Sequence, residues 1–373
     1  MEKRPHINPR LSSDPLRIGE ADGAILRAVN RLQYMTAAQV SRLLYPDARD
    51  ENRYVQRRLR RLAEAGYLLR LRELPSPRVG SAPHVFTLAD RGRQYLSGRG
   101  VGLANMYYRP SEERRKAQDN PFIEHALAAV DVLVAAERLC HEAYVSMPNL
   151  RTERQLKRNP LRVQPVGRPD APRTAVIPDA WFQLIVEGHP PASIALELDR
   201  STEHQKHWRR KVASLAAWAI GPYQEAFETD NLTVAVVTPT AARREQLSRW
   251  TCQELEVAGH PDLAGIFLFT AASPITTPPK QFFFAPLWSP AGGTEPVSML
   301  DAPSVVVNAG PDASPSPQWL DIDLPWGGGV QQEEARHDRQ ENKPLVRGPS
   351  EAPAAPKRDR SYVTWEEVRQ EAE

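Results

Sequence analysis

Cysteine is scarce in this chain. Its 373 residues include only Cys140 and Cys252, which lie far apart. Neither belongs to a Cys-x-x-Cys pair, so the sequence gives no sign of a disulfide framework or of a cysteine-ligated zinc site. We expect both to be buried free thiols.

Long hydrophobic runs are also missing. No stretch approaches the roughly 18 apolar residues of a membrane span, and the polar start at residues 1–6 does not lead into an apolar leader segment. These absences argue against membrane insertion and export. We expect a soluble, cytoplasmic protein with no membrane partner.

Proline, in contrast, is abundant, with 35 residues in a chain that is 41% hydrophobic. That combination predicts packed domains joined to segments without a core. The tail from residue 289 is rich in Pro, Ala, Gly and Ser and is expected to be disordered. Within it, residues 361–371 have a helix-like pattern that could fold on a partner.

Positive charge is concentrated in the N-terminal third. Residues 1–116 hold 23 Lys/Arg against 12 Asp/Glu, although the whole chain has a net charge of only +2. A basic domain suits a polyanion, because each neutralised phosphate releases counterions.

The pattern of residues 18–100 predicts three helices followed by a hairpin. Thr36 and Gln39 form a capping box before a helix over 37–44, and a basic helix over 51–65 ends at Gly66. Apolar runs at 67–71 and 85–88 predict the hairpin arms. This order resembles a winged helix-turn-helix domain.

That resemblance implies which residues contact double-stranded DNA. Residues facing the major groove and its phosphates would be Arg53, Arg57, Arg60 and Arg61, and Arg78 could reach the minor groove from the wing. Two other interpretations stay open: a solvated helix face, and a winged helix that serves protein contacts.

After a linker over 101–119, residues 120–288 alternate between helical and strand patterns. The expected elements are a helix at 120–140, strands near 143–146, 176–182 and 194–199, a helix at 202–220, a strand at 232–237, a helix at 241–257 and strands at 265–269 and 281–287. This predicts an α/β (α+β) domain with a mixed sheet. The order resembles that of restriction-endonuclease-like folds.

Two expected strands carry carboxylates suited to Mg²⁺. Asp179 follows Pro178, and Glu197 lies in the next strand; Mg²⁺ is typically held by one or two such groups with water and substrate phosphate. Asp199 points to the same strand face as Glu197 and stands where the nuclease motif has lysine. Lysine could come instead from the following helix, as Lys211 or Lys206.

Each acidic residue also has a structural interpretation. Asp179 could be a turn residue at a strand start, and Glu197 could form an ion pair with Arg200. Asp199 could cap or orient the helix that follows Thr202.

Taken together, residues 22–270 resemble the replication-relaxation proteins of bacterial plasmids and mobile elements. The matching features are the winged helix, His125 on a helix, the Pro-Asp strand, and the acidic strand with its Thr202-Glu203 continuation and Lys211. The resemblance implies a DNA-binding accessory protein of plasmid or mobile-element replication or relaxation, which could meet replication or relaxase proteins through its tail.

Two rival functions remain. One is an active metal-dependent endonuclease that nicks DNA, in which Asp179 and Glu197 hold Mg²⁺ and Lys211 assists. The other is a winged-helix transcription regulator whose C-terminal domain forms a homodimer or larger oligomer. Metal dependence would separate the enzyme from the other two.

Overall fold

The computed structural model describes residues 16–46, 51–71, 83–104, 120–141, 144–201 and 203–301. Three predicted features lie outside these ranges: the wing tip with Arg78, most of the 101–119 linker, and the tail beyond residue 301 with its segment at 361–371. Within the described residues, no helix is long and apolar enough to cross a membrane.

In its described residues, the N-terminal unit contains four helices and a small antiparallel sheet. Its elements are α1 (Glu20–Leu32), β1 (Met35–Thr36), α2 (Ala37–Leu44), α3 (Glu51–Glu64), β2 (Leu68–Leu71), β3 (Val85–Leu88) and α4 (Asp90–Ser97), with strand order β1-β3-β2. The predicted capping box is confirmed, since Thr36 Oγ1 accepts the Gln39 N–H at 3.3 Å and Gln39 Oε1 accepts the Thr36 N–H at 2.9 Å. The short strand β1 had no signal in the sequence.

A seven-stranded mixed sheet forms the centre of the second unit. Its strands run in the order β12-β11-β10-β9-β8-β4, and β5 also pairs with β8. Strands β9, β10 and β11 are parallel, whereas β8 and β12 run antiparallel to their neighbours. The strands are β4 (Val145–Ser146), β5 (Leu150–Thr152), β8 (Ala180–Val186), β9 (Ala192–Leu198), β10 (Thr233–Val237), β11 (Phe267–Thr270) and β12 (Ser289–Pro290).

Helices cover both faces of this sheet, which explains why β9 is buried along its whole length. On one face lie α6 (Asn120–Leu139) and α11 (Pro279–Phe284); on the other lie α8 (Gln205–Ile220), α9 (Tyr223–Phe227) and α10 (Ala241–Ala258). Successive residues of β8 point to opposite faces, Trp181 toward α8 and Phe182 toward α6. The mixed α/β class predicted from the sequence is confirmed.

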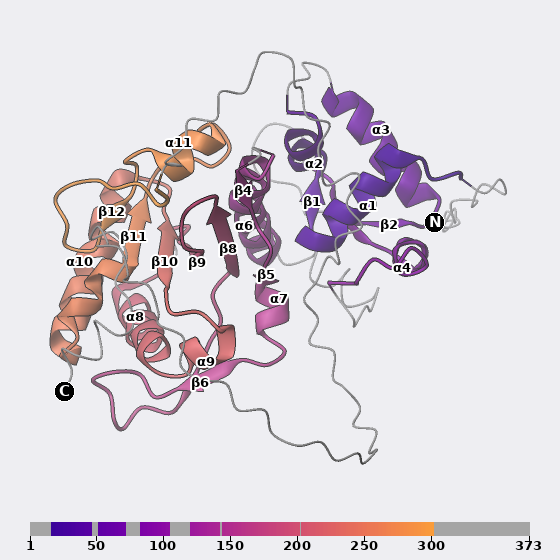
Figure 1. Cartoon of the computed structure of the whole chain (residues 1–373). Coiled ribbons are helices and arrows are strands. Elements are labelled where there is room, and N and C mark those ends of the chain that lie inside the picture. Colours follow the sequence, from indigo (N-terminus) through magenta and orange to yellow (C-terminus); the bar gives the residue numbers. More distant parts are fainter. Residues whose placement is uncertain are drawn as a thin grey trace, which may run out of the picture.

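The N-terminal unit is packed directly onto α6, which stands between that unit and the sheet (Figure 1). Arg42 of α2 forms an ion pair with Asp131, and Gln39 Nε2 donates to Leu127 O at 2.8 Å. Gln33 Nε2 donates to Thr152 Oγ1 at 2.6 Å, at the end of β5. One apolar cluster includes side chains from both units, so they share a core.

Two predicted strands are wrong. The strand expected over 176–182 is divided: β7 (Thr174–Val176) pairs with β6 (Leu161–Val163), and β8 starts only at Ala180. Pro178 separates them, because it cannot donate a ladder hydrogen bond. The strand expected over 281–287 is helix α11, whose Pro279 occupies a favourable first position and whose Phe282 and Phe283 are fully buried.

The predicted start of the tail is also wrong. Residues 289–301 belong to the fold: β12 extends the sheet, and Ala291, Met299 and Leu300 are buried. Their apolar side chains are few and spread among Pro and Gly, so the segment has the composition of a tail although it packs on the domain.

Candidate functional site

Asp179 lies just before β8, opposite Glu197 in the continued β8–β9 register. Its N–H donates to Leu196 O at 2.9 Å, and its Oδ2 accepts the Leu198 N–H at 2.7 Å. Oδ1 lies 2.7 Å from Nε2 of His125, near the start of α6. The carboxylate is therefore fixed in position between two strands and a helix. These contacts go beyond those of a residue that only forms a turn at a strand start.

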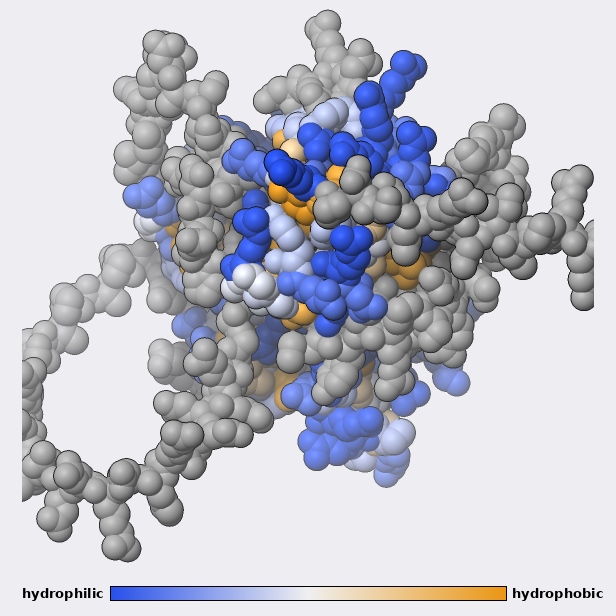
Figure 2. Space-filling view, turned by 90° about the vertical axis from the view of Figure 1, so that its right-hand side faces the viewer, coloured by the Kyte–Doolittle hydropathy of each residue, from blue (hydrophilic) through white to orange (hydrophobic). Residues whose placement is uncertain are grey.

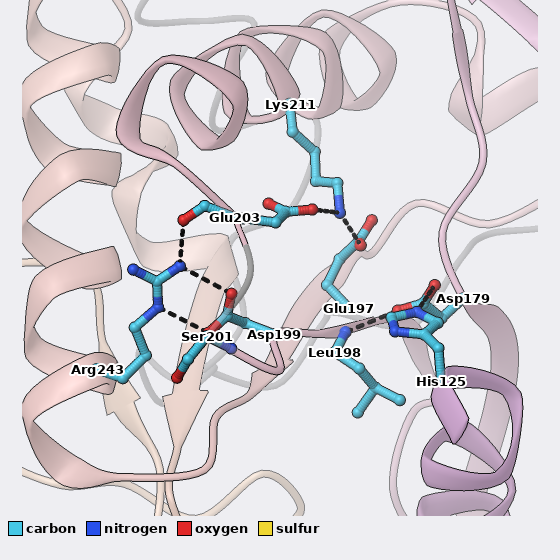
Figure 3. Close-up of polar contacts among 9 residues, drawn as sticks. All are labelled: His125, Asp179, Glu197, Leu198, Asp199, Ser201, Glu203, Lys211 and Arg243. Atoms are coloured by element: carbon cyan, nitrogen blue, oxygen red, sulfur yellow. Dashed lines mark hydrogen bonds and ion pairs between the residues drawn. The ribbon is translucent and has the colours of Figure 1, made fainter. Parts of the chain in front are cut away.

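Glu197 points from β9 toward α8 and is almost fully buried, with 3% of its side chain exposed. Lys211 Nζ lies 2.9 Å from its Oε2 and 2.8 Å from Oε1 of Glu203. Figure 3 shows the ammonium group between these two carboxylates, with Asp179 beside Glu197. The ion pair that Glu197 forms is thus with Lys211, whereas Arg200 pairs with Glu124.

The pKa of Glu197 is raised to about 7: burial is the largest cause, Lys211 opposes it, and the nearby Asp179 adds to the rise. Burial alone would lower the pKa of Lys211, but the carboxylates of Glu197, Glu203 and Asp179 raise it well above its ordinary value. Lys211 therefore stays charged near neutral pH, and Glu197 is the group of this pair that titrates. The hydrogen bond to Asp179 raises the pKa of His125.

Asp199 lies on the same strand face but has a different partner. Arg243 of α10 binds it through Nε at 2.7 Å and Nη2 at 2.9 Å, and the side chain of Asp199 is 0% exposed. Oδ2 also accepts the N–H of Ser201, at 3.0 Å. Asp199 thus orients the segment before α8, which is one of the two structural roles expected from the sequence. It does not cap the helix, because the N-cap residue of α8 is His204.

The structure brings together Asp179, Glu197 and Lys211 and separates Asp199 from them. Lys206, the other lysine candidate, is exposed on α8. Two members of the arrangement had no assigned role in the sequence: Glu203, the second partner of Lys211, and Arg243, whose Nη2 also donates to Glu203 O at 2.6 Å. Arg243 lies 44 residues from Asp199, so no local spacing could have linked the two.

The carboxylates of this cluster offer few ligands for a metal. Among the described residues, no group of three or more His, Cys, Asp or Glu could hold a metal ion. Two adjacent carboxylates, Asp179 and Glu197, remain, which meets the small protein share of a Mg²⁺ site. The buried Oε2 of Glu203 has no hydrogen-bond partner among the described residues, so the cluster has unused acceptor capacity.

The predicted DNA-contacting arginines form one stripe on α3. Arg53, Arg57, Arg60 and Arg61 are all exposed at helical spacing. Arg58 differs, because it turns inward to Asp22 at 3.0 Å. Figure 2 views the side of the molecule that carries the N-terminal unit, and most of its described surface there is hydrophilic.

A family model described as Replication-relaxation matches residues 26–229, more than half of the 373 residues. The chain belongs to the replication-relaxation family. This membership indicates a role in the replication or relaxation of plasmids or mobile elements. No curated protein and no solved structure matches the chain. The match spans both units and includes every residue of the Asp179, Glu197 and Lys211 cluster.

The stability of this replication-relaxation protein is expected to fall as the pH rises from about 4.5 to about 7, because the folded state keeps a proton on Glu197 that the unfolded chain has released. A group whose pKa is higher in the folded state stabilises the fold below its unfolded-state pKa, and this stabilisation is lost as the pH rises through its folded-state pKa. His125, also raised, acts in the same direction. Thermal melting between pH 5 and 8 should show this slope in the wild type and a smaller one in Glu197→Gln.

His125→Gln is the control that removes the histidine contribution alone. An equal slope in wild type and Glu197→Gln would contradict the assignment of the titration to Glu197.

Proposed function

We propose that this replication-relaxation protein binds double-stranded DNA through residues 18–100, acting as a winged helix-turn-helix, and holds a nuclease-like domain against that DNA. Helices α2 and α3 followed by the β2–β3 hairpin have the order of such a unit. The observation that carries the proposal is the arginine stripe on α3, whose four members are exposed while Arg58 alone turns inward.

A solvated helix face is less favoured by this arrangement. Among the described residues, one acidic side chain forms an ion pair with the stripe: Glu64, whose Oε1 lies 3.9 Å from Nε of Arg60. Exposed arginines without nearby acids repel each other, and phosphate groups relieve that repulsion. Guanidinium groups also match phosphate geometry in bidentate contacts.

Double-stranded DNA binding should weaken when the stripe is shortened. Arg57→Ala/Arg61→Ala is expected to lower affinity roughly 10- to 100-fold near 0.15 M salt, and to reduce the slope of log K against log salt by roughly 2. Fluorescence anisotropy with a labelled duplex over a salt series measures both. Arg244→Ala/Arg249→Ala on α10 removes the same charge elsewhere.

Equal losses in the two double variants would mean that net charge alone drives binding. Unchanged affinity in the α3 variant would remove the proposed DNA surface.

A second candidate function, metal-dependent DNA nicking, is favoured by the closeness of Asp179, Glu197 and Lys211. Asp179 and Glu197 would hold Mg²⁺, which when bound supplies charge that stabilises the developing negative charge on a phosphate. Lys211 keeps a positive charge beside the same carboxylates, and His125 orients Asp179. This arrangement resembles the nuclease pattern with its lysine supplied by a helix.

Conversion of supercoiled plasmid to open circle, with Mg²⁺ or Mn²⁺ and with chelator, tests this candidate. Metal-dependent nicking that is lost in Asp179→Asn and Glu197→Gln, but kept in the exposed-site control Glu245→Gln, would establish it. Intact DNA binding without nicking would leave the accessory DNA-binding function alone.

A further inference from the structure

A second basic site lies on the central domain, away from α3. It is a hollow of about 500 Å³ between the start of α8 and the end of α10. Its lining includes Arg168, Gln205, Lys206, Arg209, Glu254 and Val257. Three of these are cationic and one is acidic, so the hollow carries a net positive charge.

Two arginines of the hollow share one buried carboxylate. Glu254, with 3% of its side chain exposed, accepts from Arg209 Nε at 2.7 Å and from Arg168 Nε at 3.0 Å. One negative charge therefore holds two positive ones in place. Arg209 uses only Nε in these contacts, and among the described residues neither of its Nη groups has a hydrogen-bond partner.

The position of Arg168 is fixed by its neighbours. Gly167 has φ +65°, and a Cβ there would meet Ala258 Cα at 2.9 Å, so the chain passes α10 at a distance only glycine permits. The N–H of Val166 donates to Ala213 O of α8 at 3.1 Å. The guanidinium group is thereby set against α10 before any ligand arrives, which lowers the entropic cost of binding an anion.

The hollow is connected to the acidic site by the surface of α8. Exposed basic residues Lys206, His207 and Arg210 occupy the helix face between Arg209 and Lys211. An α-helix with side chains is only about 10 Å wide. A polyanion that crosses this face would therefore meet the Lys211 cluster on one side of α8 and the hollow on the other.

We propose that the hollow binds a phosphodiester group of a DNA strand that crosses α8, as a second anchor for the DNA held by α3. The proposal rests on DNA being the ligand of this protein. The Nη donors of Arg209 suit a phosphate, because Glu254 takes only its Nε. Lys206 adds a positive charge on a flexible side chain. The open basic continuation over α8 favours a polymer over a free nucleotide.

The test uses the full chain and the same labelled duplex and salt series. Arg209→Gln leaves Glu254 paired with Arg168, and it is expected to lower affinity roughly 3- to 10-fold and the salt slope by about 1. Lys206→Ala leaves Glu254, Arg168 and Arg209 in place. It should also lower the affinity and the salt slope. The matched control is Arg249→Gln, an exposed arginine of α10 that does not line the hollow.

The outcomes separate this site from α3. Losses in Arg209→Gln and Lys206→Ala, beyond the control, support the hollow whatever the α3 variant does. If both match Arg249→Gln while Arg57→Ala/Arg61→Ala weakens binding, the second anchor is refuted and the proposed function stands. Competition by inorganic phosphate or dAMP as strong as that by an oligonucleotide of equal phosphate concentration would instead identify a free-phosphate site.

Discussion

Replacing Lys211 by alanine is expected to destabilise the protein by about 3–5 kcal/mol near pH 8, because Glu197 would be left as a buried charge without its cation. Glu203 would lose the same partner. At lower pH Glu197 is protonated and no buried charge remains, so the loss of stability should become smaller toward pH 5. Urea unfolding of wild type and variant at both pH values measures the difference.

Lys206→Ala provides the control, since it removes an exposed lysine from the same helix; its effect should stay within about 0.5 kcal/mol. The double variant Lys211→Ala/Glu197→Gln should recover a large part of the stability, because no buried carboxylate remains at that position. A loss in Lys211→Ala that does not depend on pH would mean that the lysine contributes through packing alone.

Arg243→Ala is expected to have a comparable effect, about 3–5 kcal/mol, since Asp199 is 0% exposed and loses two hydrogen bonds at once. Arg243 also binds Glu203 O, so the variant should loosen the segment between β9 and α8. Hydrogen exchange of the Ser201 amide, bonded to Asp199 Oδ2, reports on that segment, and chemical denaturation gives the global loss.

The neighbouring Arg244→Ala is the matched control, because among the described residues Arg244 pairs only with an exposed acid, Glu245. Small and equal losses in the two variants would show that Asp199 is satisfied without Arg243.

Local signals in the sequence were sufficient for much of the fold. The Thr36–Gln39 capping box and the stripe of arginines on α3 depend on spacings of three to eight residues, and both are present. The closeness of Asp179 and Glu197 could also be predicted from the sequence, since they lie at the adjoining ends of two successive strands.

Long-range partners were beyond these signals. Gln39 was identified as a capping residue, yet its amide also donates to Leu127 O, 88 residues away. Glu124 of α6 pairs with Arg200, and the contact with Asp179 comes from the next residue, His125. A shift of one residue turns a helical side chain by about 100°, and only the packing of α6 determines which side chain faces the strands.

The shared core around α6 has a geometric consequence for DNA. Packing between α2 and α6, and not the length of the chain that joins them, sets the separation between the arginine stripe and the carboxylates. Under the proposed DNA binding, base pairs bound at α3 and a phosphate bound beside Lys211 would therefore lie a constant number of nucleotides apart. Two modules on a flexible tether would give a distribution of such intervals.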